Sequence, residues 1–295
     1  MHDPQDNPFD IANENAYRRW RDWKLTDYPT RLDQLVVEIA DPHHLSDSEH
    51  RELLRRCRKT NMAIWSGLTG HDADKNIIRD LGRRFGLERL DHNMCADNDA
   101  ITSLTVQPDA LHQGYIPYSN RPIAWHTDGY YNPLDQQIHG LLLHCVQPAH
   151  EGGENELLDH EIVYLQIRDE APDYIRALMH PEAMTIPANL GDDGQELRPE
   201  RTGPVFAVYP DGHLHMRYTD RSRSIEWRND PLLKEAVGFL KMTLKTPSPW
   251  HFRGKLEAGQ GLLCNNVLHT RSGFKDQGRQ RLLYRARYFD RILDT

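Results

Sequence analysis

The order of extended and helical segments is the feature that most constrains the fold of this chain. From residue 100 onward, short extended segments follow one another at 101–106, 123–127, 138–146, 154–158, 205–209, 213–218, 249–252, 261–264 and 280–289. Helical patterns lie at 46–59, 73–85, 161–169, 172–179 and 229–246. Many short strands with interspersed helices, and no internal repeat, predict a mainly β fold, a sandwich or barrel core flanked by helices.

Charge and length narrow the class of protein. The 295 residues include 36 Lys and Arg against 44 Asp and Glu, a formal net charge of −8. Because binding to phosphate backbones usually needs a basic stripe, this balance argues against nucleic acid as a partner and favours a small-molecule substrate. The length fits one domain over residues 1–295, with 1–60 as a wrapping segment and helix and 61–295 as the core. Oligomeric state stays open, a homo-oligomer being one alternative.

Cysteine spacing and the N-terminal sequence predict a location. Cys57, Cys95, Cys145 and Cys264 are scattered without a C-x-x-C pair, which is typical of a reducing compartment. The first residues lack the layout of a signal peptide, and the longest apolar stretches are too short to span a membrane. We therefore expect a cytoplasmic protein with no membrane partner.

A short motif, His126-Thr127-Asp128, suggests a metal site. Residues two apart on an extended segment point to the same side of the chain. With a distant His269, the pair would form a set of two histidines and one carboxylate, the arrangement that non-haem Fe(II) oxygenases use. The alternative is ordinary: His126 as a hydrogen-bonded strand residue and Asp128 as the start of a turn with Gly129.

The last predicted strand carries an unusual row of cations. Arg281, Arg285 and Arg287 share one parity, and the apolar parity between them can pack on the core. The alternative is a solvated strand face. Three arginines without an interleaved acid would repel one another there unless an anion lies among them.

Four motifs together resemble one enzyme family, the TauD/TfdA or clavaminate-synthase-like Fe(II)/2-oxoglutarate dioxygenases. They are Trp125-His126-Thr127-Asp128-Gly129, Glu151-Gly152-Gly153-Glu154-Asn155, Asn265…His269-Thr270-Arg271…Phe274 and Arg281…Arg285, in matching order over residues 60 to 290. The resemblance implies a double-stranded β-helix, or jelly-roll, core. It also implies Fe(II) on His126, Asp128 and His269, with Arg281 on the distal carboxylate of 2-oxoglutarate and Arg285 on an anionic group of the substrate.

Departures from the family pattern refine this expectation. The family usually has a threonine where this chain has Asn155, whose amide can donate the same hydrogen bond to 2-oxoglutarate. The turn before His269 is a residue shorter than usual. Halogenating relatives replace the carboxylate ligand with a small residue, so Asp128 favours hydroxylation or a related oxidation.

The predicted function is oxidation of a small, anionic organic substrate with O2, releasing succinate and CO2. Two alternatives remain: a mononuclear iron oxidase that does not use 2-oxoglutarate, and a non-catalytic sensor that binds iron or 2-oxoglutarate. Residues 184–201, rich in Gly, Asp and Glu, are a candidate lid. Candidate substrate residues, besides Arg285 and Arg287, are Tyr115, Tyr118, Asn120, Tyr130 and Arg217.

Overall fold

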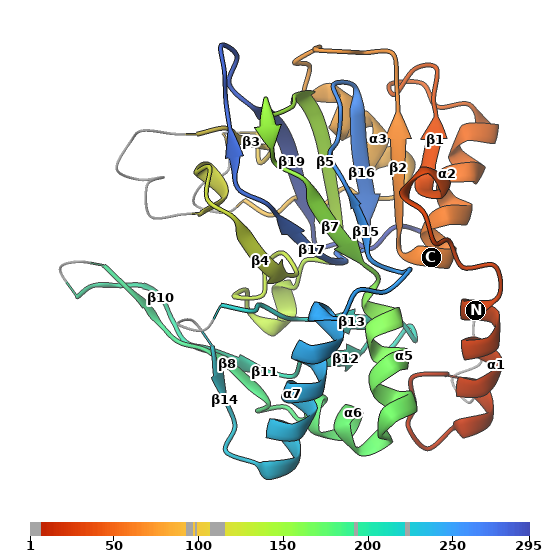
Figure 1. Cartoon of the computed structure of the whole chain (residues 1–295), viewed down its shortest axis with the longest axis vertical. Coiled ribbons are helices and arrows are strands. Elements are labelled where there is room, and N and C mark those ends of the chain that lie inside the picture. The colour runs from red at the N-terminus through yellow and green to blue at the C-terminus, as the bar shows by residue number, and fades with distance from the viewer. Residues whose placement is uncertain (1–6, 93–96, 98, 107–115, 192–193, 222–224) are drawn as a thin grey trace. The chain divides into compact units, whose positions relative to one another are not determined.

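The computed structural model describes residues 7–92, 97, 99–106, 116–191, 194–221 and 225–295 (Figure 1). The chain divides into two compact units, each assembled from segments that are far apart in the sequence. Unit 1 comprises residues 1–28, 125–137 and 158–248, and unit 2 comprises residues 29–124, 138–157 and 249–295. The predicted wrapping segment 1–60 therefore contributes to both units, and the single-domain organisation stays a prediction.

Unit 2 is built on a six-stranded sheet with the order β1-β2-β16-β5-β19-β3. Its strands are β1 (Val36–Glu38), β2 (Met62–Ser66), β16 (Gln260–Cys264), β5 (Gly140–Gln147), β19 (Leu282–Tyr288) and β3 (Thr102–Leu104). Only β1 and β2 run parallel; the other neighbours are antiparallel. A second sheet has the order β15-β7-β17-β4, with β15 (Phe252–Gly254), β7 (Asn155–Leu158), β17 (Leu268–Arg271) and β4 (Ile123–His126). Short strands β6 (Glu151–Gly152) and β18 (Phe274–Lys275) pair with each other.

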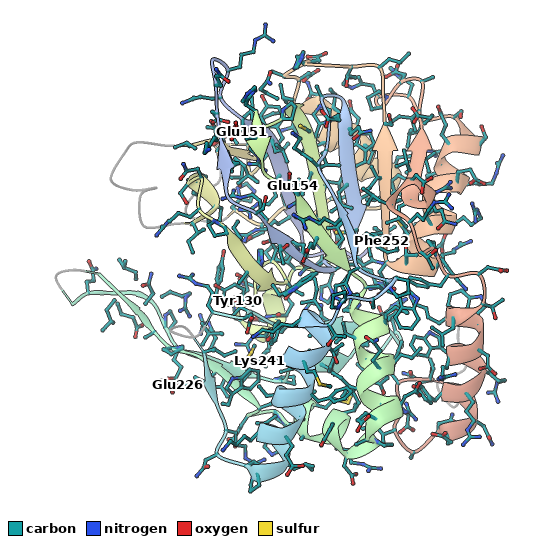
Figure 2. All side chains as sticks on the ribbon, in the orientation of Figure 1. Tyr130, Glu151, Glu154, Glu226, Lys241 and Phe252 are labelled. Atoms are coloured by element: carbon teal, nitrogen blue, oxygen red, sulfur yellow. The ribbon has the colours of Figure 1, made fainter. Side chains whose placement is uncertain are left out.

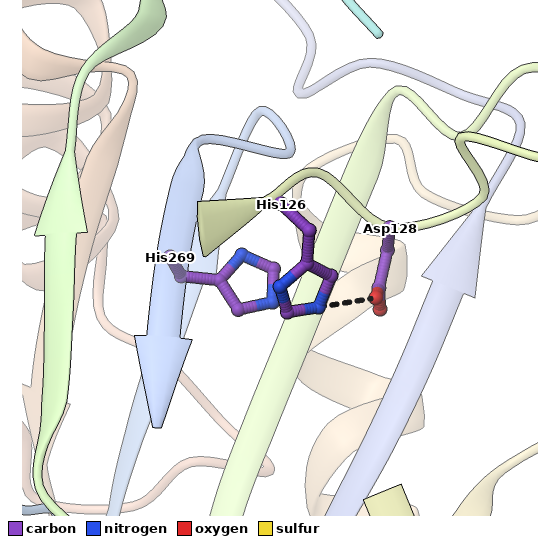
Figure 3. Close-up of side chains that lie close together, drawn as sticks. All are labelled: His126, Asp128 and His269. Atoms are coloured by element: carbon purple, nitrogen blue, oxygen red, sulfur yellow. Dashed lines mark ion pairs between the residues drawn. The ribbon is translucent and has the colours of Figure 1, made fainter. Parts of the chain in front are cut away.

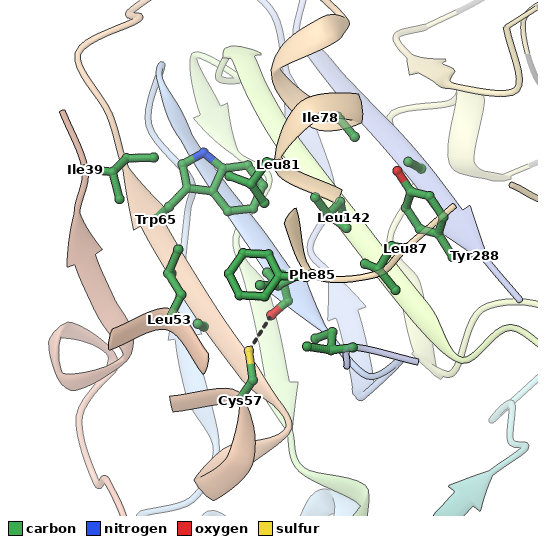
Figure 4. Packing of buried hydrophobic residues seen from close by; sticks show 14 of the residues in the cluster. Ile39, Leu53, Cys57, Trp65, Ile78, Leu81, Phe85, Leu87, Leu142 and Tyr288 are labelled. Atoms are coloured by element: carbon green, nitrogen blue, oxygen red, sulfur yellow. Dashed lines mark hydrogen bonds between the residues drawn. The ribbon is translucent and has the colours of Figure 1, made fainter. Parts of the chain in front are cut away.

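One face of the six-stranded sheet forms the main hydrophobic core (Figure 4). Alternate strand residues, including Trp65, Leu142, Leu263 and Tyr284, pack there against the helices α2 (Asp47–Thr60) and α3 (Asn76–Arg84). The intervening residues Ile64, Leu143 and Leu262 instead line a cavity of about 350 Å³, together with Leu157 of β7. The alternation of side chains along the strands thus places one set in the packed core and the other set against the cavity.

The predicted helix start at Ser46 is confirmed. The Ser46 hydroxyl accepts a hydrogen bond from the Glu49 backbone N–H, and the Glu49 carboxylate accepts one from Ser46. This reciprocal cap satisfies two backbone donors that the first helical turn leaves without partners. The helix ends at Thr60, before Asn61 in a left-handed conformation.

Unit 1 is mainly helical. Its helices are α1 (Glu14–Leu25), α5 (His160–Glu170), α6 (Pro172–Leu178) and α7 (Pro231–Lys245), with a short 3-10 turn, η4, at Leu134–Gln136. The helical pattern predicted at 229–246 is confirmed by α7, along which Leu233, Val237, Leu240 and Leu244 are buried. The prediction for residues 1–60 did not identify α1, because its buried positions are Ala16, Tyr17 and Lys24 and not an aliphatic stripe.

A buried ionic contact fixes α1 in unit 1. The Lys24 ammonium is fully buried and lies 2.7 Å from a carboxylate oxygen of Asp159 and 2.6 Å from one of Glu161, at the start of α5. Burial opposes the charge, but the two carboxylates outweigh it and raise the pKa of Lys24. A cation without these partners would be costly at this depth.

Short strands complete unit 1. They are β8 (Met184–Ile186), β9 (Asn189–Leu190), β10 (Glu196–Arg198), β11 (Arg201–Gly203), β12 (Phe206–Val208), β13 (Leu214–Met216) and β14 (Glu226–Trp227). The extended segments predicted at 205–209 and 213–218 contain β12 and β13, which pair antiparallel around Pro210-Asp211-Gly212. The candidate lid, 184–201, contains β8 and the β9–β10 hairpin; residues 192–193 lie outside the described part, and closure stays a prediction. Among the described helices, none is long and apolar enough to cross a membrane.

His144 is an imidazole enclosed in the main core region. It lies on β5 between Gly261 and Tyr284, with its ring stacked parallel to Trp65 at 6.4 Å. A side chain at Gly261 would overlap Trp65, because a Cβ there would lie 1.9 Å from an indole carbon. Burial lowers the pKa of His144 from 6.5 to about 4, so the folded protein holds this ring neutral.

This burial predicts a specific dependence of stability on pH. Between pH 6.5 and 4 the unfolded chain takes up a proton on His144 and the folded chain does not, so the free energy of unfolding falls as pH falls. In His144→Gln that part of the decline, about 2–3 kcal/mol, is absent. Urea unfolding of both proteins at pH 7 and pH 4.5 measures it; equal declines in the two proteins would contradict the assignment.

Candidate metal centre

His126 and Asp128 lie on a backbone segment that is fixed by a neighbouring strand end. The Thr127 N–H donates to the Tyr218 carbonyl at 3.0 Å, and the Asp220 N–H donates to the Trp125 carbonyl at 2.8 Å. The Thr127 hydroxyl accepts a further bond from the Tyr218 N–H. The contacts of Thr127 therefore fix the backbone between the two predicted ligands, His126 and Asp128.

The two predicted ligands of this segment point toward each other. His126 Nε2 lies 3.6 Å from Asp128 Oδ1, and the Asp128 side chain is 5% exposed (Figure 3). Gly129, which follows, has φ +68° and opens the turn that the Asp-Gly pair predicted. The two predictions for Asp128 are therefore compatible, because Asp128 is part of the turn while its carboxylate lies beside His126.

His269 is held by its own strand, β17. Its Nδ1 lies 2.9 Å from the Val267 carbonyl oxygen. A carbonyl can only accept, so Nδ1 carries the proton and Nε2 keeps the lone pair that a metal requires. The ring is 9% exposed.

The structure brings these three side chains together. One ligand atom from each of His126, Asp128 and His269 lies within 4.8 Å of the others (Figure 3). Two imidazole nitrogens and one carboxylate oxygen match the donor set of the facial triad for Fe(II). The donor chemistry therefore fits the predicted metal.

Arg281 is a buried cation beside β19. Its side chain is 4% exposed, its guanidinium lies 5.1 Å from the centre of the Phe274 ring, and burial lowers its pKa to about 10. No acidic side chain in the described part of the chain forms an ion pair with it. Gly153 lies nearby, since a Cβ there would be 3.9 Å from Arg281 Nε, an ordinary contact; its φ of +78° is what favours glycine at this position. Such a site favours an anionic ligand.

Asn155 occupies the position where the family pattern has threonine. Its side-chain nitrogen donates to the Thr270 carbonyl at 2.8 Å, next to His269 in the sequence. That nitrogen carries a second hydrogen, so the amide can still donate to an anion. Asn155 also lines the cavity of unit 2.

The parity predicted for the last strand is confirmed. Tyr284, Ala286 and Tyr288 belong to the main core, while Arg285 and Arg287 occupy the alternate positions and are 9% and 3% exposed. The arginine face is therefore buried and not solvated. Arg287 forms an ion pair with Asp91, whose backbone N–H also donates to the Arg287 carbonyl at 2.8 Å. β19 contains no acidic residue, so the carboxylate that pairs with Arg287 comes from Asp91, outside this strand.

The other candidate substrate residues differ in burial and in their contacts with the rest of the chain. Tyr118 is buried in a short 3-10 turn, η3 (Ile116–Tyr118), whereas Asn120 is exposed. Tyr130 is partly buried, with its ring 5.2 Å from that of Tyr131 (Figure 2). Arg217 donates to the backbone carbonyls of Tyr130, Met184 and Arg201. Tyr115 lies outside the described residues.

Comparison with known proteins agrees with this geometry. The family model described as "Taurine catabolism dioxygenase TauD, TfdA family" matches residues 25–287. The chain belongs to the TauD/TfdA family. Two similar relatives are named uridine-5′-phosphate dioxygenase: one from Amycolatopsis sp, 29% identical over 62% of this chain and 66% of its own length, and one from Streptomyces sp, 30% identical over 64% and 69%.

Solved structures of similar fold support the core architecture. An asparagine oxygenase in complex with Fe(II), 3-hydroxyasparagine and succinate has a TM-score of 0.60 at 13% identity, covering 84% of this chain and 81% of its own. A taurine dioxygenase from Burkholderia xenovorans has a TM-score of 0.56 at 16% identity, covering 86% and 88%. The expected mainly β, jelly-roll fold and the assignment to Fe(II)/2-oxoglutarate dioxygenases are confirmed at the level of the family.

The Asp91–Arg287 contact generates a stability prediction. Asp91→Ala removes the carboxylate that pairs with the buried Arg287 guanidinium, so the free energy of unfolding should fall by about 3–5 kcal/mol. Asp33→Ala is the matched control: Asp33 pairs with Arg31 at the surface with 69% of its side chain exposed, so its loss should leave the free energy of unfolding nearly unchanged. Urea denaturation measures both. Equal, small effects would show that Asp91 is not the counter-charge of Arg287.

Proposed function

We propose that this chain is an Fe(II)/2-oxoglutarate-dependent dioxygenase that hydroxylates a small anionic substrate, with Fe(II) bound by His126, Asp128 and His269. The observation that carries the proposal is the approach of the three ligand atoms to within 4.8 Å of one another. Membership of the TauD/TfdA family indicates that 2-oxoglutarate and O2 are the co-substrates. When bound, Fe(II) with 2-oxoglutarate and O2 supplies the oxidation of a substrate C–H bond, with release of succinate and CO2.

The residues of the chain would orient the reactants. The Val267 carbonyl fixes the His269 tautomer, and the strand contacts of Thr127 fix the spacing of the other two ligands. Arg281 would bind the distal carboxylate of 2-oxoglutarate, and its burial makes that contact stronger than it would be in water. Asn155 would add a hydrogen bond from its amide.

We assign the anionic group of the substrate to Arg285, with Tyr118, Asn120 and Tyr130 as further candidate contacts. Arg285 lies on the buried face of β19, four residues after Arg281 in the sequence. Arg287 is left out of this site, because Asp91 already balances its charge. Two relatives are named for uridine-5′-phosphate, so a nucleoside monophosphate is one candidate substrate, beside sulfonates and amino acids.

We also propose a cytoplasmic location. Three of the four cysteines, Cys57, Cys145 and Cys264, are free thiols and are buried. Cys95 lies outside the described residues. Free thiols are the expected state in a reducing compartment.

Succinate formation tests the activity. We expect succinate from wild-type protein supplied with Fe(II), 2-oxoglutarate and O2, stimulated by the correct compound in a panel of uridine 5′-phosphate, taurine, asparagine and other compounds that carry a phosphate, sulfonate or carboxylate group. Asp128→Ala and His269→Ala should lose at least 100-fold in rate, whereas His150→Ala, a change at an exposed histidine, should not. Unchanged succinate formation in the two ligand variants would exclude this metal site; its absence in the wild type would favour a binding protein.

Arg285 tests the charge of the substrate. Arg285→Ala removes a charge-assisted hydrogen bond of about 1.5–3 kcal/mol, so the KM for the substrate should rise roughly tenfold to hundredfold. The KM for 2-oxoglutarate should change less than threefold. Arg253→Ala, at an exposed arginine on β15, is the control. An unaltered substrate KM in Arg285→Ala would rule out this residue as the anion site.

A further inference from the structure

Arg271 has an environment that its place in the family motif does not explain. It is the last residue of β17, 4% exposed, and two positions beyond His269. Its terminal nitrogens donate to four backbone carbonyls of one short segment: Ile116 at 3.4 Å, Pro117 at 3.2 Å, Ser119 at 2.6 Å and Arg121 at 2.7 Å. Burying a guanidinium against neutral carbonyls is costly, and burial with repulsion from Arg281 and Arg285 lowers the pKa of Arg271 to about 9.

The same segment is also bonded to β18, the strand that follows β17. The Phe274 N–H donates to the Asn120 carbonyl at 3.1 Å. The Phe274 ring lies 5.0 Å from the Arg271 guanidinium and 5.1 Å from that of Arg281. Segment 116–121 is therefore held close to the arginine that is proposed to bind 2-oxoglutarate.

The segment is short and mostly irregular. Apart from the 3-10 turn and the bonds around Ser119, it contains no regular structure, and it leads directly into β4 and His126. It also carries Tyr118 and Asn120. A single side chain thus connects the strand of one metal ligand to the segment that precedes another.

We propose that Arg271 is a positioning residue: by binding the carbonyls of 116–121 it fixes Tyr118 and Asn120 beside the arginine face and so sets the affinity for the substrate. This inference rests on the proposed function for the identity of the reaction. The role is geometric, because a planar guanidinium can donate to several carbonyls at once and an ammonium cannot. Arg271→Lys keeps the charge near Arg281 and Arg285 and removes the geometry.

Hydrogen exchange followed by mass spectrometry tests the restraint without any substrate. In Arg271→Lys and Arg271→Met, peptides covering 116–122 should exchange at least fivefold faster than in the wild type, and peptides elsewhere should stay within twofold. Arg279→Met, at an exposed arginine, should match the wild type throughout. Wild-type protection in Arg271→Lys, or faster exchange over the whole chain, would overturn the proposal.

Steady-state kinetics with the panel compound that stimulates succinate formation test the consequence. In Arg271→Lys we expect the KM for that compound to rise about tenfold, with kcat and the KM for 2-oxoglutarate within about twofold. A loosened segment with an unchanged substrate KM would overturn the positioning role. If the wild type forms no succinate, the proposed function fails and the link to substrate fails with it, while the exchange result still decides whether Arg271 holds the segment.

Discussion

The pairing of β19 with β5 in the six-stranded sheet is the constraint on which the other features of unit 2 depend. Because side chains alternate along a strand, one register places Tyr284, Ala286 and Tyr288 in the core and commits Arg285 and Arg287 to the opposite face. A shift of one residue would exchange the two faces and bury cations among apolar side chains. The packing of the core side chains therefore fixes this register, and the same register places Arg285 and Arg287 on the opposite, buried face of the strand.

Buried arginines need compensation, and three of those in unit 2 obtain it in different ways. Arg287 has a carboxylate, Asp91. Arg271 has four backbone carbonyls. The Arg281 guanidinium lies over the Phe274 ring, but no acidic side chain among the described residues forms an ion pair with it. Its charge can therefore pair with an anionic co-substrate that binds and is released. The protein thus separates arginines that stabilise the fold from one that is suited to a co-substrate.

Much of this could be read from the sequence, and the limits have a physical cause. The strands, the capped helix at Ser46, the parity of the last strand and the candidate ligands His126, Asp128 and His269 depend on local patterns or short motifs. Asp91 and the carbonyls that Arg271 contacts could not be predicted, because their partners lie 196 and about 150 residues away and no periodicity marks them. The helix α1 was missed for a related reason: Lys24 is buried only because Asp159 and Glu161 meet it. All substrate contacts, that of Arg285 included, remain predictions.

The central claim is that His126, Asp128 and His269 bind Fe(II) in a form that also binds 2-oxoglutarate. Anaerobic titration of the wild-type protein with Fe(II) and then with 2-oxoglutarate tests it most directly. The account predicts a visible charge-transfer band that needs both additions, is lost in His269→Ala and is bleached by O2. A wild-type protein that binds Fe(II) but develops no such band with saturating 2-oxoglutarate would contradict it.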